Sequence, residues 1–367
     1  MRRTRRLQFG PLVFLILCVY ASASTLATFN APGAGTGAGQ GTVPVSMNQN
    51  AVIAGFYLDG NSTYHGFVRS PNGVISTGNI PGAGSGTGQG TLPYSINGTG
   101  AIAGYYIDSN SVNHGFLRSS AGSVATFDAP GAGTGAFEGT FAVNINAGST
   151  VGGYFSDGNF VFHGFVRANG TITPFDVPGA GTGSFQGTFT GSGDCLNTAG
   201  TLVGESADSN SVSHAFLRTS DGTITSYDVP GAGTGKNQGT GATGINDSGV
   251  IAGNYIDSNG VNHGYVRDSS GNVTEFDVAG AGTGSGEGTF PENINASGAV
   301  IGQYLDASGV AHGFQRTPAG VITTGDVPGA GTRAGEGTIP SNNNAGGQIN
   351  GTYIDSGAVS HGFLLTP

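Results

Sequence analysis

The residues best suited to chemistry are an aspartate and a histidine six positions apart, as in Asp257 and His263. A carboxylate beside an imidazole occurs in catalytic dyads and in many metal sites. This pair occurs seven times, however, whereas an active site is a single asymmetric arrangement. We therefore interpret the pairs as structural residues that secure hairpin hydrogen bonds. In the alternative, the seven histidines face one channel and bind a transition metal.

The pairs have a fixed period along the chain. They are Asp59 and His65, Asp108 and His114, Asp157 and His163, Asp208 and His214, Asp257 and His263, Asp306 and His312, and Asp355 and His361. Successive histidines are separated by 49, 49, 51, 49, 49 and 49 residues. A period of about 50 residues is typical of an array, a solenoid or a propeller.

The fourth copy of the repeat is irregular and contains the second candidate for chemistry. It has two extra residues around Gly191 to Asp194, and Glu205-Ser206 replaces the usual apolar-aromatic step. Acid–base chemistry on a glycosidic bond needs two positioned carboxyl groups. Asp194 and Glu205 are thus the candidate catalytic residues of a hydrolase or lyase that acts on polysaccharide, with simple drift of one repeat as the structural interpretation.

Phe137 and Phe185 are the other deviation. They occupy the same loop position in adjacent repeats, where the other copies have glycine or asparagine. A pair of exposed aromatic rings suits stacking against a sugar or contact with a protein. Packing of each ring against the neighbouring repeat is the alternative.

Three further repeated motifs are interpreted as parts of the scaffold. The Pro-Gly-Ala-Gly-Thr-Gly loops lack the following helix and the regular lysine of a phosphate-binding loop. The Asp-Ser-Asn-Gly turns lack the spaced carboxylates of a calcium loop, so we expect no cofactor, with calcium as the alternative. A Gln or Glu that precedes each Gly-Thr is expected to pin its loop: Gln40, Gln89, Glu138, Gln186, Gln238, Glu287 and Glu336.

Short strands must position all of these residues. In the fifth copy, apolar residues alternate between turn residues over 239–246, 250–257, 263–267 and 272–278. The Asn-Gly at 259–260 is a strong hairpin signal, because both residues tolerate positive φ. No segment has helical periodicity. Each copy is therefore predicted to be a four-stranded antiparallel meander.

The two ends of the chain predict a closed ring. Residues 28–32 resemble the fourth strand of a repeat, whereas the chain ends in a third strand at 361–363. The first strand would complete the last repeat, as in propellers, and would cover the edges that an open stack exposes. We predict an all-β, seven-bladed β-propeller whose blades, numbered as repeats 1 to 7, span 38–80, 87–130, 136–178, 184–230, 236–279, 285–328, and 334–367 with 25–32.

The first residues predict export. Arginines at positions 2 to 6 precede an apolar run at 12–20 and small residues at 21–23, so we expect residues 1–23 to be a secretory signal peptide and 24–367 a single domain. Without the leader, 8 Lys and Arg face 22 Asp and Glu, a net charge of −14, which excludes typical nucleic-acid binding. We expect a monomer that is secreted, extracellular or in the cell envelope, with no transmembrane segment in the mature chain.

The repeat also resembles a known family. Ile-Asn, Gly-x-Tyr-x-Asp and His-Gly-Phe-x-Arg recur in this order, and His214-Ala215-Phe216 replaces His-Gly-Phe once. This pattern is similar to the HAF-type extracellular repeats of bacterial exported proteins, although Leu365 stands where the other copies have arginine. The resemblance covers the mature chain and implies export, but it brings no activity with it. We expect a non-enzymatic binding or structural propeller whose partner is a polysaccharide or an exported protein.

Overall fold

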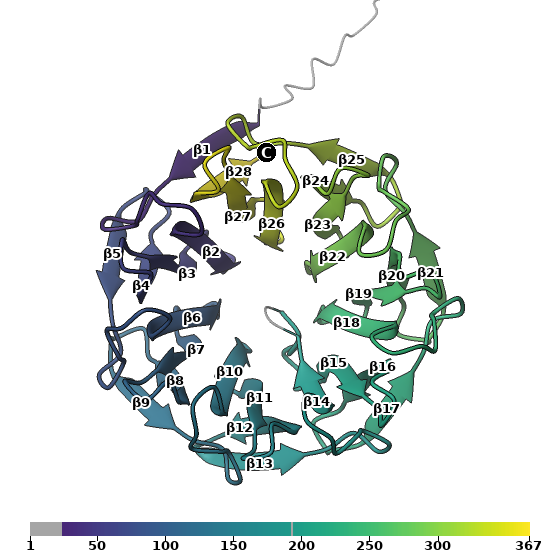
Figure 1. Ribbon diagram of the computed structural model, residues 1–367, viewed down its shortest axis with the longest axis horizontal. Helices are drawn as coiled ribbons and strands as arrows, with labels where there is room; N and C mark the ends of the chain where they lie inside the picture. Colours follow the sequence, from purple (N-terminus) through teal and green to yellow (C-terminus); the bar gives the residue numbers. More distant parts are fainter. Residues whose placement is uncertain (1–23, 192–193) are drawn as a thin grey trace, which may run out of the picture.

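The protein folds as a closed ring of β-strands (Figure 1). The computed structural model describes residues 24–191 and 194–367, and the predicted signal peptide at 1–23 lies outside them. The described residues form 28 strands. Among these residues there is no helix long and apolar enough to cross a membrane.

Each repeat runs outward from the central opening. The innermost strands are β2 (Gly41–Met47), β6 (Gly90–Ile96), β10 (Gly139–Ile145), β14 (Gly187–Thr190), β18 (Gly239–Ile245), β22 (Gly288–Ile294) and β26 (Gly337–Asn343). The second strands are β3 (Ile53–Leu58), β7 (Ile102–Ile107), β11 (Val151–Ser156), β15 (Leu202–Ala207), β19 (Ile251–Ile256), β23 (Val300–Leu305) and β27 (Ile349–Ile354). The third strands are β4 (Tyr64–Arg69), β8 (Asn113–Arg118), β12 (Phe162–Ala168), β16 (Ser213–Arg218), β20 (Asn262–Arg267), β24 (Ala311–Arg316) and β28 (Ser360–Thr366). The outermost strands are β5 (Ile75–Gly78), β9 (Val124–Phe127), β13 (Thr171–Phe175), β17 (Ile224–Tyr227), β21 (Val273–Phe276), β25 (Ile322–Gly325) and β1 (Thr25–Phe29).

Strand pairing within a repeat is antiparallel, and pairing between repeats is minimal. β2, β3, β4 and β5 pair in that order, and the same order recurs around the ring. Each third strand makes a single parallel bridge to the next innermost strand, as between Tyr64 and Gly90, so that all 28 strands form one continuous sheet. Gly90 has a φ of 126°, and a Cβ there would collide with the carbonyl oxygen of Tyr64. This close approach accounts for the glycine of the repeated Gly-Thr.

The ends of the chain close the ring. β1 pairs antiparallel with β28, from Thr25 opposite Thr366 to Phe29 opposite Gly362. β28 in turn pairs with β27 and bridges to β2. The four strand segments expected in the fifth repeat also agree with β18 to β21 to within two residues at each boundary.

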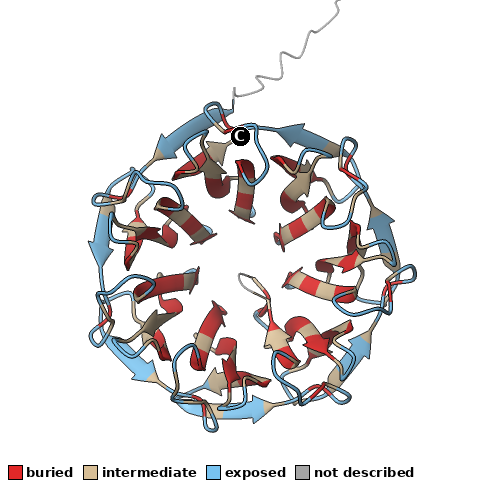
Figure 2. Ribbon diagram, in the orientation of Figure 1, coloured by how far each residue is buried: buried red, intermediate tan, exposed pale blue. Residues whose placement is uncertain are grey.

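The core lies between neighbouring repeats. Each third strand buries one large aromatic side chain, exposed by no more than 3%: Phe67, Phe116, Phe165, Phe216, Tyr265, Phe314 and Phe363. The second strands contribute buried aliphatic side chains such as Ile53 and Ile251. Figure 2 shows burial concentrated in the inner strands, while the outermost strands are exposed. Stacking of repeat on repeat therefore supplies the apolar cover that no single four-stranded sheet has.

A chain of asparagine side chains joins the inner turns. Asn48 Nδ2 donates to the carbonyl oxygen of Asn97 at 3.1 Å, and Asn97 donates likewise to Asn146 at 3.1 Å. The series continues through Asn197, Asn246 and Asn295 to Asn344. Each Oδ1 accepts a backbone N–H of its own turn, such as that of Val52 for Asn48. The repeated asparagine thus links seven successive turns through six hydrogen bonds.

Candidate functional site

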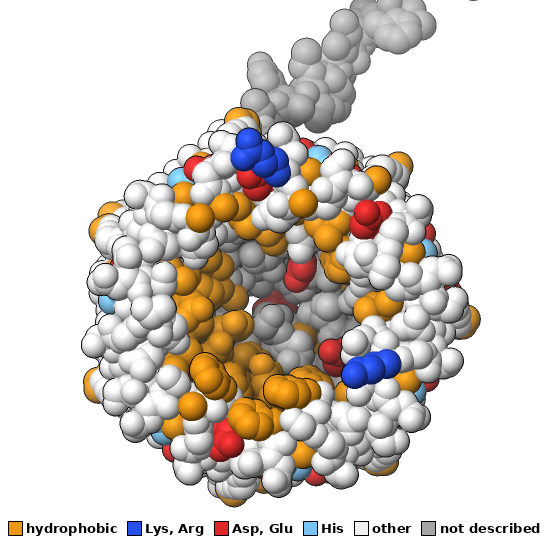
Figure 3. All heavy atoms as spheres, in the orientation of Figure 1, with side chains coloured by type: hydrophobic (Ala, Val, Ile, Leu, Met, Phe, Trp, Pro, Cys, Tyr) orange, Lys and Arg blue, Asp and Glu red, His pale blue; other side chains and the backbone are white. Residues whose placement is uncertain are grey.

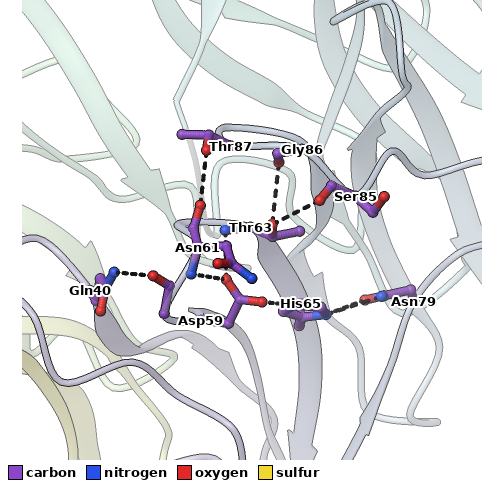
Figure 4. Close-up of polar contacts among 10 residues, drawn as sticks. Gln40, Asp59, Asn61, Thr63, His65, Asn79, Ser85, Gly86 and Thr87 are labelled. Carbon is purple, nitrogen blue, oxygen red and sulfur yellow. Dashed lines mark hydrogen bonds and ion pairs between the residues drawn. The ribbon is translucent and has the colours of Figure 1, made fainter.

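The Asp–His pairs lie at the hairpin that joins the second and third strands (Figure 4). Asp59 Oδ1 accepts the backbone N–H of Asn61 at 2.8 Å and that of Thr63 at 3.0 Å. His65 Nε2 lies 3.2 Å from Asp59 Oδ2, and its ring stacks on Tyr57 with the centroids 4.9 Å apart. The hydrogen bond from Thr63 holds the pKa of Asp59 below its ordinary value of 3.8, and the bond to His65 adds to this effect.

Each histidine has a second partner that follows the outermost strand. In five repeats this is an aspartate within 3.0 Å of Nδ1: Asp128, Asp176, Asp228, Asp277 and Asp326. His65 and His361 meet Asn79 and Asn30 instead. The histidines consequently lie around the outer edge of the ring (Figure 3), and the alternative in which they face the channel is wrong. Within residues 24–191 and 194–367 there is no cluster of three or more His, Cys, Asp and Glu suited to a metal ion.

The Gln or Glu before each Gly-Thr binds the glycine-rich loop that leads into its repeat. Gln40 Oε1 accepts the N–H of Gly37 at 2.9 Å, and its Nε2 donates to the carbonyl of Gly60 at 3.1 Å (Figure 4). Glu138 Oε2 accepts the N–H of Gly135 at 2.6 Å in the same way. This side chain therefore holds the glycine-rich loop against a hairpin turn.

Asp194 reaches across the channel from the irregular fourth repeat. Its Oδ2 accepts from Nδ2 of Asn293 in β22 at 3.1 Å and from Nδ2 of Asn342 in β26 at 3.2 Å. Its backbone carbonyl accepts the N–H of Ile245 at 2.9 Å. Burial raises the pKa of Asp194, and the two amide hydrogen bonds oppose that rise. Asp194 lines a cavity of about 260 Å³ bordered by the asparagine turns.

Glu205 lies in a different environment. It projects from β15 toward β18, where a Cβ on Gly241 would stand 2.9 Å from its Oε2. Gly241 occupies the position of Phe141 and Phe189 in other repeats, so its missing side chain makes room for the carboxylate. Burial raises the pKa of Glu205, against a hydrogen bond from Ser213. Asp194 and Glu205, the alternative acid–base pair, share no hydrogen-bond partner among the described residues.

Three further polar residues, Asn254, Glu292 and Gln303, were not identified from the sequence. Glu292 in β22 accepts from Gln303 Nε2 at 3.5 Å, and burial raises the pKa of Glu292 from 4.5 to about 7. Asn254 in β19 donates to Asn262 Oδ1 at 3.1 Å. We call Glu205, Asn254, Glu292 and Gln303 the polar wall. Glu205, Asn254 and Gln303 occupy one and the same position of the repeat, directly after the glycine of the second strand.

In repeats 1 to 3 that position is aromatic. Phe56, Tyr105 and Tyr154 stand there, and neighbouring strands add further rings. The resulting aromatic wall consists of Phe56, Tyr64, Tyr94, Tyr105, Phe141, Tyr154, Phe162 and Phe189. Successive rings contact one another across three repeat boundaries. The distances between ring centroids are 6.4 Å for Phe56 and Tyr94, 5.1 Å for Tyr105 and Phe141, and 6.0 Å for Tyr154 and Phe189.

The aromatic wall continues to the exposed Phe185. Phe185 lies 6.4 Å from Phe162 and stacks on Phe160 at 5.6 Å, measured between ring centroids. Phe185 is 67% exposed and Phe137 is 73% exposed. In Figure 3 hydrophobic side chains gather on the left and lower sides of the central opening, toward the strands β2 to β14, whereas the opposite side is mostly polar.

Three phenylalanines in this region have left-handed backbone conformations. The φ angles are 69° at Phe137, 59° at Phe160 and 63° at Phe185. The equivalent residues of Phe137 and Phe185 are Gly39, Gly88, Asn237, Gly286 and Gly335. Bulky residues are rare in this conformation, and each such residue costs about 1–3 kcal/mol. Both phenylalanines noted in the sequence are therefore strained as well as exposed.

Comparisons with known proteins extend to the fold alone. No protein-family model matches the chain, and no curated protein matches it. The BP39L lectin from Burkholderia pseudomallei is similar in structure, with a TM-score of 0.58 and 11% identity over 89% of this chain and 96% of that one. Puromycin hydrolase is similar with a TM-score of 0.50 and 10% identity over 89% of this chain, which spans only 50% of the hydrolase. These likenesses support an all-β, β-propeller-like ring of repeated strands.

Proposed function

We propose that this protein is an exported, non-enzymatic seven-bladed β-propeller that binds polysaccharide at the aromatic mouth of its channel. Each repeat is one four-stranded blade, and β1 completes the last blade. The antiparallel pairing in sets of four and the single-residue bridges between sets support this division. Residues 1–23 act as the signal peptide and 24–367 as one domain of the HAF type, in keeping with the repeat motifs.

The observation that carries the proposal is the strain at Phe137 and Phe185. Five other repeats hold glycine or asparagine at this position, and these residues adopt a positive φ at little cost. Phenylalanine adds strain and exposes about 70% of its surface to water, so folding alone gives little reason to prefer it to glycine here. Strained residues that persist on a surface are typical of binding sites.

The surroundings of these rings suit a sugar. Flat aromatic faces stack on the C–H faces of pyranose rings, while amides and carboxylates accept sugar hydroxyls. The aromatic wall offers the first kind of contact, and the polar wall offers the second through Glu205, Asn254 and Gln303. A lectin is among the proteins with a similar closed ring of strands. This likeness agrees with the proposal, but the proposal does not depend on it.

Glycan-array binding of the purified protein, with and without calcium, tests the proposal. The double variant Phe137→Gly with Phe185→Gly restores the residue of other repeats, so it should fold at least as stably as the natural protein. We expect it to lose most of the binding. Asn237→Gly is the matched control at the same position of repeat 5, where no exposed ring is lost, and it should bind normally. Unchanged binding by the double variant would exclude these rings as the site.

A further inference from the structure

Most boundaries between repeats are filled by one aromatic ring. The last residue of the outermost strand packs edge-on against the buried aromatic residue of the next third strand, with centroids 6.0 to 6.3 Å apart. An arginine of that third strand covers the ring, with its guanidinium carbon 4.7 to 5.0 Å from the centroid. The five rings are Phe29, Phe127, Phe175, Tyr227 and Phe276.

At two boundaries the ring is replaced by glycine. Gly78 ends β5 and Gly325 ends β25, and a Cβ on either residue would have no neighbour within 4 Å. A pocket opens at each place, with about 480 Å³ beside Gly78 and about 280 Å³ beside Gly325. Their walls include Phe116 and Phe363, the residues against which the missing rings would pack.

The two pockets differ in charge. Arg118 lines the Gly78 pocket and occupies the position of the arginines that cover a ring elsewhere. Leu365 lines the Gly325 pocket at the same position, so that pocket has no cation there. Pro93 closes the inner side of the Gly78 pocket, and Pro340 closes the inner side of the Gly325 pocket.

We propose that both pockets bind the ring of a small monocyclic aromatic compound in the place of the missing side chain. The five filled boundaries show the geometry of the bound ring: edge-on to a buried aromatic residue, and under a guanidinium where one is present. The volumes exceed the roughly 150 Å³ of an apolar cavity that binds benzene. The Gly78 pocket also takes an aromatic carboxylate, because Arg118 pairs with the anion.

Titrations of the full chain with phenol and with phenylacetate, followed by ligand-observed NMR, test this site. Phenol should bind at two sites, and Gly78→Phe and Gly325→Phe should each remove one of them. Phenylacetate binding should be abolished by Gly78→Phe and unaffected by Gly325→Phe. Gly78→Ala and Gly325→Ala are the matched controls, since a methyl group leaves each pocket open. Both Phe variants should also raise the melting temperature, because they restore the packing of the other boundaries.

A second variant keeps the test independent of folding. Arg118→Leu converts the Gly78 pocket to the type found at Gly325, so phenylacetate should bind about tenfold more weakly while phenol still binds. Phenol binding that survives the double change Gly78→Phe with Gly325→Phe would overturn the proposal. So would a methyl hexoside that binds these pockets as well as phenol does. The channel variant Phe137→Gly with Phe185→Gly should leave phenol binding unchanged, so the two proposals succeed or fail separately.

Discussion

The outer side of the ring and the wall of its channel follow opposite rules. On the outer side, the aspartate of each hairpin turn accepts two backbone N–H groups at 2.8 to 3.0 Å in every repeat. In the channel, one position of the second strand is Phe56 in repeat 1, Glu205 in repeat 4 and Gln303 in repeat 6. Residues that repeat hold the scaffold, because every repeat has the same packing problem. Residues that differ between repeats serve a purpose that only some repeats share. Binding of a ligand on one side of the channel is such a purpose.

Removal of β1 should have the largest effect on the scaffold. Deletion of residues 25–29 leaves the edge of β28 unpaired and takes Phe29 away from Phe67 and Arg69. Thermal unfolding should begin at a much lower temperature and lose its cooperativity. Leu26→Thr, at a side chain that is 40% exposed, is the control and should change little. A deletion variant that melts like the natural protein would argue for an open stack.

Truncation of a core ring should come next in size. Phe216→Ala removes a fully buried side chain and should lower the free energy of unfolding by about 3–5 kcal/mol. Phe165→Ala, at the same position of repeat 3, should cost the same within error, because both rings are 0% exposed. Denaturant titration measures both values. Lys236→Ala, on the exposed loop of repeat 5, should be neutral. Very different costs at residues 165 and 216 would contradict the uniformity of the scaffold.

The turn aspartates should contribute equally and more modestly. Asp108→Ala and Asp257→Ala each remove two hydrogen bonds from backbone N–H groups, at about 1–2 kcal/mol per variant. The pKa of Asp59 is lowered chiefly by the hydrogen bond from Thr63, so its contribution is present above pH 3.8 and is lost as pH falls through the lowered pKa. Acid unfolding curves should therefore shift to higher pH in Asp59→Ala. A variant with the natural acid midpoint would show that this turn carries no such linkage.

The smallest effect on stability should come from Glu292, in the channel. Burial raises its pKa from 4.5 to about 7, so the folded protein binds more protons than the unfolded chain between these values. The free energy of unfolding should consequently fall as pH rises from 4.5 to 7, by less than about 1 kcal/mol because Glu292 is only partly buried and solvent screens its charge. Glu292→Gln should flatten this slope in unfolding curves measured across that range. Glu287→Gln, in a scaffold loop, is the control and should leave the slope in place.

The scaffold was largely predictable because its signals are periodic. The spacing of His263 and its equivalents, the Asn-Gly turns and the fourth-strand pattern at residues 28–32 indicated repeated strands and the pairing of β1 with β28. A local sequence pattern that recurs seven times is compatible with few arrangements of strands. The seven-fold division into blades follows from the same pattern and stays a proposal.

The channel was less predictable because its contacts join distant parts of the chain. Phe137 and Phe185 stood out as deviations, but their backbone strain required coordinates. Asp194 contacts Asn293 and Asn342, which are 99 and 148 residues away, and no local pattern announces such a contact. The glycines at 78 and 325 were visible in the sequence, since the equivalent residues are aromatic. That these glycines leave pockets could be inferred only from the structure, which shows that an aromatic ring fills the other five boundaries between repeats.

The pairing of β1 with β28 also sets how the molecule responds to mechanical load. The two strands are antiparallel, so residues 24 and 367 lie at the same end of the pair, next to Thr25 and Thr366. Tension between the two ends loads that first rung alone and then each following rung in turn as far as Phe29 and Gly362. The ring therefore unzips at this seam under a weak pull.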